Sequence, residues 1–122
     1  CLAFDADPDL NLYNGQSHPV TVFVYPLSSS AAFEQMTVDD LLGGTQGSGM
    51  LSAPSQITVG PGEQDRRFEK LFPPQTGQLG VIADYYRAPG DVEGTRRQVV
   101  KASCTPFLSP RLTLSARDLY LD

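Results

Sequence analysis

Apolar and polar residues alternate along several short segments of the chain, as they do in half-buried β-strands. The pattern is clearest at residues 2–6 (LAFDA), where every second residue is apolar, and at residues 20–25 (VTVFVY), which are all β-branched or aromatic. Pro8 and Pro26 should end these two segments, because proline has no N–H to donate to a β-ladder. We therefore expect strands at 2–6 and 20–25.

A helical pattern follows the second of these strands. Residues 31–36 and 38–42 predict one broken helix or two short helices. Thr37 fits the N-cap of the second part, with Asp40 as the partner that reaches back in a capping box, and Gly43-Gly44 should end it. The chain should therefore carry a short helical insert after its second strand.

Further β-type segments continue to the end of the chain, separated by turns rich in glycine and proline. Within the longest of them Tyr85 and Tyr86 should face opposite ways, so that one is in the core and the other at the surface. The expected strands are residues 56–59, 66–71, 78–87, 96–102, 112–114 and 119–121, the last two forming a hairpin. About eight strands, with no internal repeat or linker, predict a mainly β, two-sheet β-sandwich as one domain over residues 1–122.

Composition and charge narrow the function classes. The chain is 40% hydrophobic and 19% charged, which is typical of a globular domain. Its net charge of -5 argues against nucleic-acid binding, which needs a basic face. Residues 1–65 carry eight acids and no Lys or Arg, and all nine basic residues follow. Either the two parts mix in one sandwich and the asymmetry vanishes, or the surface is dipolar and orients a charged partner.

Patterns for catalysis, metals and cofactors are weak. His18, the single histidine, lies in a polar turn before a proline, and we expect no orienting partner of the kind a catalytic triad needs. Residues 5–9 (DADPD) resemble the start of a calcium loop, but that loop's required glycine and final glutamate are missing. The glycine-rich residues 43–49 lack the lysine of a phosphate-binding loop and predict a flexible loop. We expect no enzyme, metal, cofactor or small-molecule substrate.

The two cysteines, Cys1 and Cys104, leave two alternatives. A sandwich could bring them together in a disulfide, which in the chain-entropy model would stabilise the fold by about 4 to 5 kcal/mol. Alternatively, Cys1 carries the lipid of a lipoprotein and Cys104 is a free thiol. The strand expected to begin at Leu2 leaves no tether after Cys1, which favours the disulfide and places the lipid-bearing cysteine upstream.

Tyr86 and Arg87, near the end of the longest β segment, are of the residue types that anchor protein interfaces. A structural role for them is the alternative. A second candidate for partner binding is the polar loop of residues 12–19, which carries glycine and proline and lies between two firm strands. The sequence therefore indicates binding rather than catalysis.

Several motifs, in their order along the chain, resemble those of the type VI secretion lipoprotein family (TssJ, SciN or VasD). They are Asp9-Leu10-Asn11, Ser17-His18-Pro19, the run from Val20 to Leu27, Phe33-Glu34, Asp39-Asp40-Leu41 and Gly60-Pro61-Gly62-Glu63. The family's A-x-Y-R-D motif is matched at Ala83, Tyr86 and Arg87, but Ala88 replaces the aspartate. The tryptophan of its W-R pair is replaced by Thr95 before Arg96, so the packing roles of these two positions are in doubt.

The resemblance implies a transthyretin-like sandwich on a lipoprotein of the outer membrane that faces the periplasm. It implies binding to the periplasmic C-terminal domain of the inner-membrane protein TssM, through the loop between the first two strands. In this chain that loop is Leu12, Tyr13, Asn14, Gly15, Gln16, Ser17, His18 and Pro19. The lipid would be on a cysteine upstream or on Cys1. The alternative function is a periplasmic or secreted adhesion or carbohydrate-binding module, in which exposed tyrosines stack on sugars.

Overall fold

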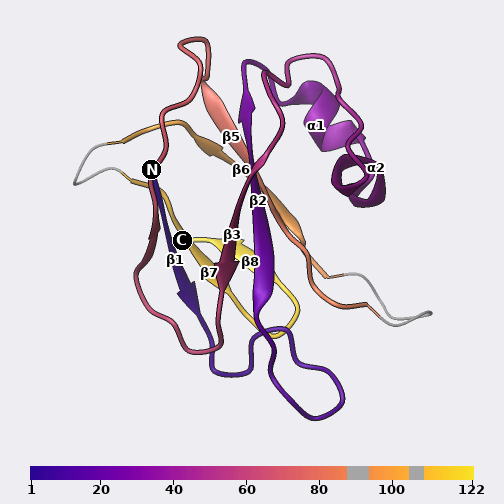
Figure 1. Cartoon of the computed structure of the whole chain (residues 1–122), viewed down its shortest axis with the longest axis vertical. Coiled ribbons are helices and arrows are strands. Elements are labelled where there is room, and N and C mark those ends of the chain that lie inside the picture. The colour runs from indigo at the N-terminus through magenta and orange to yellow at the C-terminus, as the bar shows by residue number, and fades with distance from the viewer. Residues whose placement is uncertain (88–93, 105–108) are drawn as a thin grey trace.

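Two four-stranded sheets form the body of the protein in the computed structural model, which describes residues 1–87, 94–104 and 109–122 (Figure 1). The first sheet has the order β4 (Arg66–Phe68), β1 (Leu2–Ala6), β7 (Arg111–Leu114), β8 (Leu119–Leu121). The second has the order β3 (Ser55–Val59), β2 (Val20–Leu27), β5 (Gln78–Ala83), β6 (Arg97–Lys101). Two short helices, α1 (Ala31–Gln35) and α2 (Val38–Leu42), follow β2. The predicted β-sandwich with a helical insert is confirmed.

The connection from β1 to β2 determines where the candidate site lies. β1 pairs antiparallel with β4 and parallel with β7 in the first sheet, whereas β2 pairs antiparallel with β3 and β5 in the second. The chain between Ala6 and Val20 therefore crosses from one sheet to the other at one end of the sandwich. β7 and β8 form the predicted closing hairpin.

The second sheet is covered on both of its faces around β2 and β5, whereas Gln56 and Thr58 of β3 stay exposed on the outer face. Its inner face meets the first sheet in one core, to which β5 contributes the predicted series Leu79, Val81 and Ala83, with Tyr85 following the strand. Its outer face is covered by the helices in a second cluster, made of Tyr25, Leu27, Phe33, Val38, Leu41 and Ile82. Because the pleat alternates, one strand serves both clusters.

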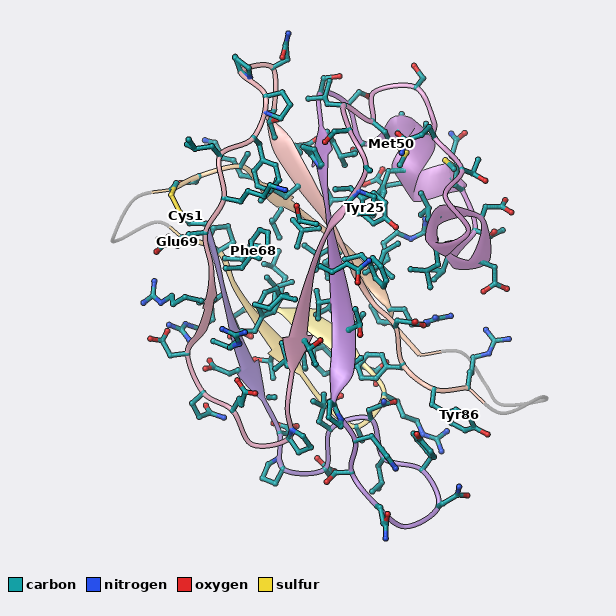
Figure 2. The ribbon with its side chains drawn as sticks, in the orientation of Figure 1. Cys1, Tyr25, Met50, Phe68, Glu69 and Tyr86 are labelled. Atoms are coloured by element: carbon teal, nitrogen blue, oxygen red, sulfur yellow. A yellow bond between two sulfur atoms is a disulfide. The ribbon has the colours of Figure 1, made fainter. Side chains whose placement is uncertain are left out.

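Phe33 of α1 docks directly on the backbone of β5. A Cβ at Gly80 would lie 2.6 to 2.8 Å from the Phe33 ring, so only glycine fits there. Arg97 of β6 donates from Nη1 to the carbonyl oxygens of Phe33 and Met36, at 2.5 and 2.6 Å. Figure 2 shows Tyr25 pointing from β2 toward the helices, where its hydroxyl donates to the Leu41 carbonyl at 3.3 Å. Burial raises the pKa of Tyr25 to about 12.

The two helices and their capping follow the sequence pattern. The hydroxyl of Thr37 accepts from the backbone N–H of Asp40 at 3.0 Å, which is the Thr37 half of the predicted capping box. Gly44 follows with a left-handed φ of 94°, and its N–H donates to the Leu41 carbonyl. The predicted end at Gly43-Gly44 is therefore confirmed.

Pro26 does not end the second strand, so this prediction was wrong. β2 continues to Leu27 and keeps its pairing with β5, while its pairing with β3 stops at Val24. The Pro26 carbonyl accepts from the N–H of Leu51 on the β3 side. In an antiparallel strand the N–H and C=O of one residue point to the same side, so the missing N–H lies where the β3 ladder has already ended. The loop from 43 to 52 is thereby held against β2.

The strand predicted at 78–87 ends early, at Ala83. The N–H of Tyr85 turns back to the Ala83 carbonyl at 3.0 Å, and the N–H of Tyr86 donates to the Asn11 side chain. The N–H of Asp84 still donates to the Thr21 carbonyl of β2, and residues 85–87 then leave the sheet and approach the loop between β1 and β2. Tyr85 is buried and Tyr86 is exposed, as expected.

The strand predicted at 66–71 is also shorter, because its partner runs out. β4 ends at Phe68, which is inward as expected and pairs with Leu2, the first residue of β1. Residues 69–71 have no strand beside them in this sheet and form a loop. β6 spans 97–101 rather than 96–102, and β3 spans 55–59 rather than 56–59.

Acids of the first part of the chain pair with basic residues of the second on the outer face of the first sheet. Arg111 donates to Asp5 at 2.9 Å and to Asp65 at 2.8 Å, and Arg67 lies 3.1 Å from Asp65. The hydrogen bond from the Asp65 N–H, and then Arg111, lower the pKa of Asp5. At these residues the charge asymmetry of the sequence cancels in space, as the mixing alternative expects.

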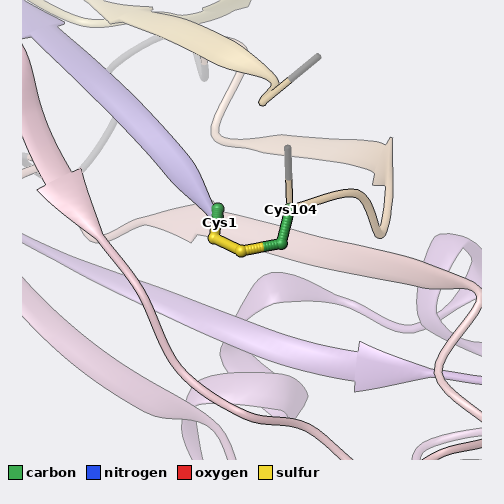
Figure 3. The surroundings of a disulfide bond; sticks show 2 residues. All are labelled: Cys1 and Cys104. Atoms are coloured by element: carbon green, nitrogen blue, oxygen red, sulfur yellow. A yellow bond between two sulfur atoms is a disulfide. The ribbon is translucent and has the colours of Figure 1, made fainter. Parts of the chain in front are cut away.

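A disulfide joins Cys1 to Cys104, at the start of β1 and beyond the end of β6 (Figure 3). Their Cα atoms are 4.7 Å apart, within the usual range for a disulfide, and the sequence separation is 103 residues. The prediction of a disulfide is confirmed. While this bond exists, the sulfur atom of Cys1 is unavailable for a thioether-linked lipid. In the described part of the chain, no helix has the length and apolar character to cross a membrane.

Candidate functional site

Asn11 holds the loop between β1 and β2 together. It is buried, with 7% of its surface exposed, and has a left-handed φ of 49°, which asparagine tolerates better than most residues. Its Nδ2 donates to the Pro19 carbonyl at 3.1 Å, and its Oδ1 accepts from the backbone N–H of Tyr86 at 2.8 Å. One side chain therefore ties both ends of the loop to the segment after β5.

The tip of the loop is a tight two-residue turn. The N–H groups of Tyr13 and Gln16 donate to each other's carbonyls at 3.0 and 3.1 Å. Between them Asn14 and Gly15 have φ values of 53° and 73°, which is the type I′ geometry that the Asn-Gly pair favours. The tip is thus defined by its own hydrogen bonds, and its direction is set by the frame beneath it.

Three aromatic rings gather beside this turn. The rings of Tyr13 and His18 stack with centroids 3.6 Å apart and planes 6° apart. The centroid of the Tyr86 ring lies 4.1 Å from that of Tyr13, and the two planes are tilted by 31°. Because His18 and Tyr86 both lie this close to the centre of Tyr13, they would overlap on one face and must occupy opposite faces of its ring. His18 Nδ1 is also 3.2 Å from the Asn11 carbonyl oxygen, so the expectation that His18 has no orienting partner was wrong. The loop folds its histidine inward onto a tyrosine.

The turn between β7 and β8 supports the loop from the first sheet. The N–H of Leu12 donates to the Ala116 carbonyl at 3.3 Å, and the Tyr85 hydroxyl donates to the Asp118 carbonyl at 2.7 Å. Burial raises the pKa of Tyr85. Asp118 Oδ1 accepts from the N–H of Thr95 at 2.6 Å. Thr95, which replaces the tryptophan of the family's W-R pair, therefore has a defined contact with the turn between β7 and β8. Ala88, the other departure, lies outside the described residues.

We call this end of the molecule, residues 10–19 with Tyr85 and Tyr86, the loop pole. At its surface Leu12 is 39% and Tyr86 is 52% exposed, Tyr13, Ser17 and His18 are half-buried, and Asn14, Gly15, Gln16 and Pro19 are exposed. Arg87 instead lines a separate hollow of about 220 Å³ with Thr37, Val38 and Asp39. The structure therefore brings Tyr86 together with the predicted loop and places Arg87 beside the start of α2.

Sequence reasoning missed the two supports of the loop pole, Asn11 and the turn at 115–118. Asn11 could have been singled out, because it belongs to the Asp9-Leu10-Asn11 motif. The dipeptide Asn14-Gly15 is a hairpin signal and could have predicted the tight turn at the tip of the loop. Nothing in the sequence pairs Leu12 with Ala116, because that contact joins a loop and a turn that are far apart along the chain.

The loop pole exposes side chains of the kinds that are found in protein interfaces. Large aromatic side chains held by buried hydrogen bonds are typical anchors of protein interfaces, since little side-chain freedom is lost on binding. Asp5, the first residue of the calcium-like pattern, is instead bound to Arg111. Among the described residues, no group of three or more His, Cys, Asp or Glu side chains is positioned to hold a metal ion.

Three solved structures share this fold. Serratia marcescens Lip, described as a membrane bound component of the type VI secretion system, is 22% identical, with a TM-score of 0.83 and coverage of 99% of this chain and 94% of that one. The type VI lipoprotein TssJ1 from Pseudomonas aeruginosa is 27% identical, with a TM-score of 0.81 and coverage of 99% and 92%. A chain in the structure described as the TssM C-terminal domain (869–1107) from EAEC is 20% identical, with a TM-score of 0.77 and coverage of 99% and 98%.

A search of curated proteins finds no match. The family model described as type VI secretion lipoprotein (VasD, EvfM, TssJ) matches residues 1–117. This match covers nearly the whole sequence and agrees with the resemblance found from the motifs. The chain belongs to the type VI secretion lipoprotein family.

Proposed function

We propose that this chain, acting as one domain, is the non-enzymatic periplasmic part of an outer-membrane lipoprotein, and that its loop pole binds the periplasmic C-terminal domain of TssM. The observation that carries the proposal is the aromatic cluster of Tyr13, His18 and Tyr86, held by buried Asn11. An exposed ring on a hydrogen-bonded frame can enter a partner's pocket without first being ordered.

The comparison with the TssM structure supports the choice of partner. The alignment covers 99% of this chain and 98% of the matched chain, so the two are of nearly equal length. The domain numbered 869–1107 is about twice as long as this chain. Such a difference is expected if that structure holds the TssM domain in complex with a protein like this one.

The disulfide supports the periplasmic location and the position of the lipid. Disulfides persist in the oxidising bacterial periplasm and are rare in the cytosol. Because the sulfur of Cys1 is bonded to Cys104, the lipid belongs on a cysteine upstream of Cys1. Whatever segment joins that lipid to Cys1 enters the domain at the start of β1.

The carbohydrate-binding alternative is less favoured by the loop pole. A sugar stacks on an open aromatic face, but Tyr13 is covered by His18 on one face and by Tyr86 on the other. Of the three clustered rings, Tyr86 is the most exposed, at 52%. A single open ring suits a pocket on a protein partner better than a sugar platform.

The test is binding of the purified TssM periplasmic domain to variants of the loop pole, measured by calorimetry. Tyr86→Ala should weaken binding about 30-fold, the loss expected for an interface hot spot. Replacing residues 13–18 by a Gly/Ser turn should abolish binding while the melting temperature stays nearly unchanged.

Leu121→Ala is the matched control, because Leu121 of β8 is 47% exposed and lies outside the loop pole. It should bind TssM as the unaltered chain does. The proposal fails if the Gly/Ser replacement keeps full affinity, or if Leu121→Ala and Tyr86→Ala weaken binding equally.

A further inference from the structure

Leu71 is the most exposed large apolar side chain among the described residues, with 97% of its surface accessible. It lies in the loop that follows β4, and this loop is anchored on both sides of Leu71. Lys70 donates from Nζ to the Ser55 hydroxyl at 2.7 Å, and the Phe72 ring packs against the core with its centroid 6.3 Å from that of Phe68. The exposure of Leu71 is therefore imposed by its neighbours.

Leu71 borders a largely apolar surface around the disulfide. Two adjoining shallow hollows, of about 320 and 210 Å³, share Cys1, Lys70, Leu71 and Cys104 in their linings. The smaller one extends over Phe72, Pro73 and Ala102. We call this end, Cys1, Cys104, Glu69–Pro73 and Ala102, the disulfide pole.

The disulfide pole and the loop pole lie at different ends of the molecule. β1 begins beside the disulfide and leads away from it toward Asn11 and the loop. Figure 2 shows Cys1 and Glu69 on one side of the molecule and Tyr86 on the opposite side. A chain segment that enters at Cys1 therefore leaves the loop pole free.

We propose that the disulfide pole rests on the periplasmic leaflet of the membrane and inserts Leu71 among the lipids. The inference rests on the proposed lipid anchor, because the segment that carries the lipid enters the domain at this pole. A tether holds the nearby surface at a high local concentration of lipid, so one apolar side chain and a shallow apolar surface suffice for contact. Lys70 and Glu69 together add no net charge that an anionic leaflet would repel.

The test uses the absence of tryptophan from the natural sequence. Leu71→Trp places a unique fluorophore at the disulfide pole, and Tyr120→Trp places one on β8, outside the disulfide pole, as the matched control. Each protein carries an N-terminal histidine tag and is held on phosphatidylethanolamine–phosphatidylglycerol vesicles by a nickel-chelating lipid, which replaces the natural anchor. The emission of Leu71→Trp should shift to shorter wavelength and be quenched by brominated lipid, whereas Tyr120→Trp should show neither change.

A second measurement avoids the tryptophan. Leu71→Gln should weaken the binding of the tagged domain to the same vesicles, at a limiting amount of nickel-chelating lipid, by about tenfold, since one leucine side chain is no longer transferred from water. The Gly/Ser replacement of the loop pole should leave this vesicle binding unchanged.

Unchanged emission of Leu71→Trp on the vesicles overturns the proposal. So does an equal shift in both tryptophan variants, or a shift that depends on protein concentration without vesicles, which would indicate self-association. Binding of the TssM domain is measured on the same tethered samples. If TssM binds and Leu71→Trp stays in water, only the membrane proposal fails; if Leu71→Trp inserts and TssM does not bind, only the proposed function fails.

Discussion

The two ends of this sandwich present apolar side chains by different means. At the loop pole, Tyr86 is held by hydrogen bonds that converge on the buried amide of Asn11. At the disulfide pole, Leu71 is held by its anchored neighbours, beside a covalent bond between Cys1 and Cys104. The loop pole is therefore held together by the polar side chain of Asn11, and the disulfide pole contains a disulfide bond. Because the strands between them are a rigid frame, each end can be broken without the other.

The largest effect should follow removal of the covalent bond. Replacing both Cys1 and Cys104 by serine frees the unfolded chain from a closure over 103 residues of sequence separation. In the chain-entropy model the free energy of unfolding should fall by about 4 kcal/mol, measured by urea denaturation. TssM affinity should stay unchanged at temperatures where the variant is folded, because the loop pole does not contact the disulfide.

Ser103→Ala is the control for this prediction, since it alters the same segment and keeps both sulfurs. It should denature at the urea concentration of the unaltered chain. An unaltered midpoint for the double serine variant would contradict the assigned weight of the disulfide, and a large loss of TssM affinity would contradict the independence of the two ends.

A smaller effect on stability, with a larger effect on partner binding, should follow replacement of Asn11. Asn11→Ala removes both side-chain hydrogen bonds and forces alanine into a left-handed backbone. The free energy of unfolding should fall by about 2 to 3 kcal/mol. Tyr86 should also lose its support, so TssM should bind more weakly, as calorimetry would measure.

Asn11→Gly separates the two causes. Glycine accepts the left-handed φ of 49° without strain but makes neither hydrogen bond, so it should be about 1 kcal/mol more stable than Asn11→Ala. Both variants should lose TssM affinity equally. If Asn11→Gly binds TssM like the unaltered chain, the hydrogen bonds of Asn11 are not what positions the site.

The smallest effect on stability should come from lowering the pH, and it should arise at Asp5, Asp65 and Arg111, which belong to neither end of the molecule. The pKa of Asp5 is lowered by the Asp65 N–H and by Arg111, and the pKa of Asp65 is lowered by Arg111. A lowered folded pKa stabilises the fold above the unfolded value, and this stability is lost as pH falls through the folded value. The melting temperature should therefore decline gently below about pH 4. Arg111→Gln should flatten this decline, and an unchanged pH profile in that variant would refute the assignment.

Strand positions were predictable wherever local pattern and pairing partner agree. The alternation in β1 and the β-branched run of β2 fall where expected, because both strands are paired along most of their length. β4 stops at Phe68 because β1 begins at Leu2, and β2 passes Pro26 because the β3 ladder has already ended. The ends of β4 and β2 are therefore set by the extent of their partner strands, and the residue pattern of one segment carries no information about its partner.

The candidate site was predictable in part for the same reason. The loop at 12–19 and Tyr86 were each identified from residue type and position, but their contact was not. That contact requires β5 to end at Ala83 and the amide of Asn11 to bridge two segments that are 75 residues apart. His18 shows the limit most clearly, since only the folded loop brings its ring onto Tyr13.

The sequence by itself determined the sandwich class, the place of the helical insert and the family. These follow from periodicity, capping residues and ordered motifs, which act over a few neighbours along the chain. Only the tertiary structure decided that Tyr86 joins the loop, that Arg87 turns toward α2, and that Leu71 stands exposed beside the disulfide. These depend on sheet register and on contacts between distant segments, whose free energy exists only once both sheets are packed together.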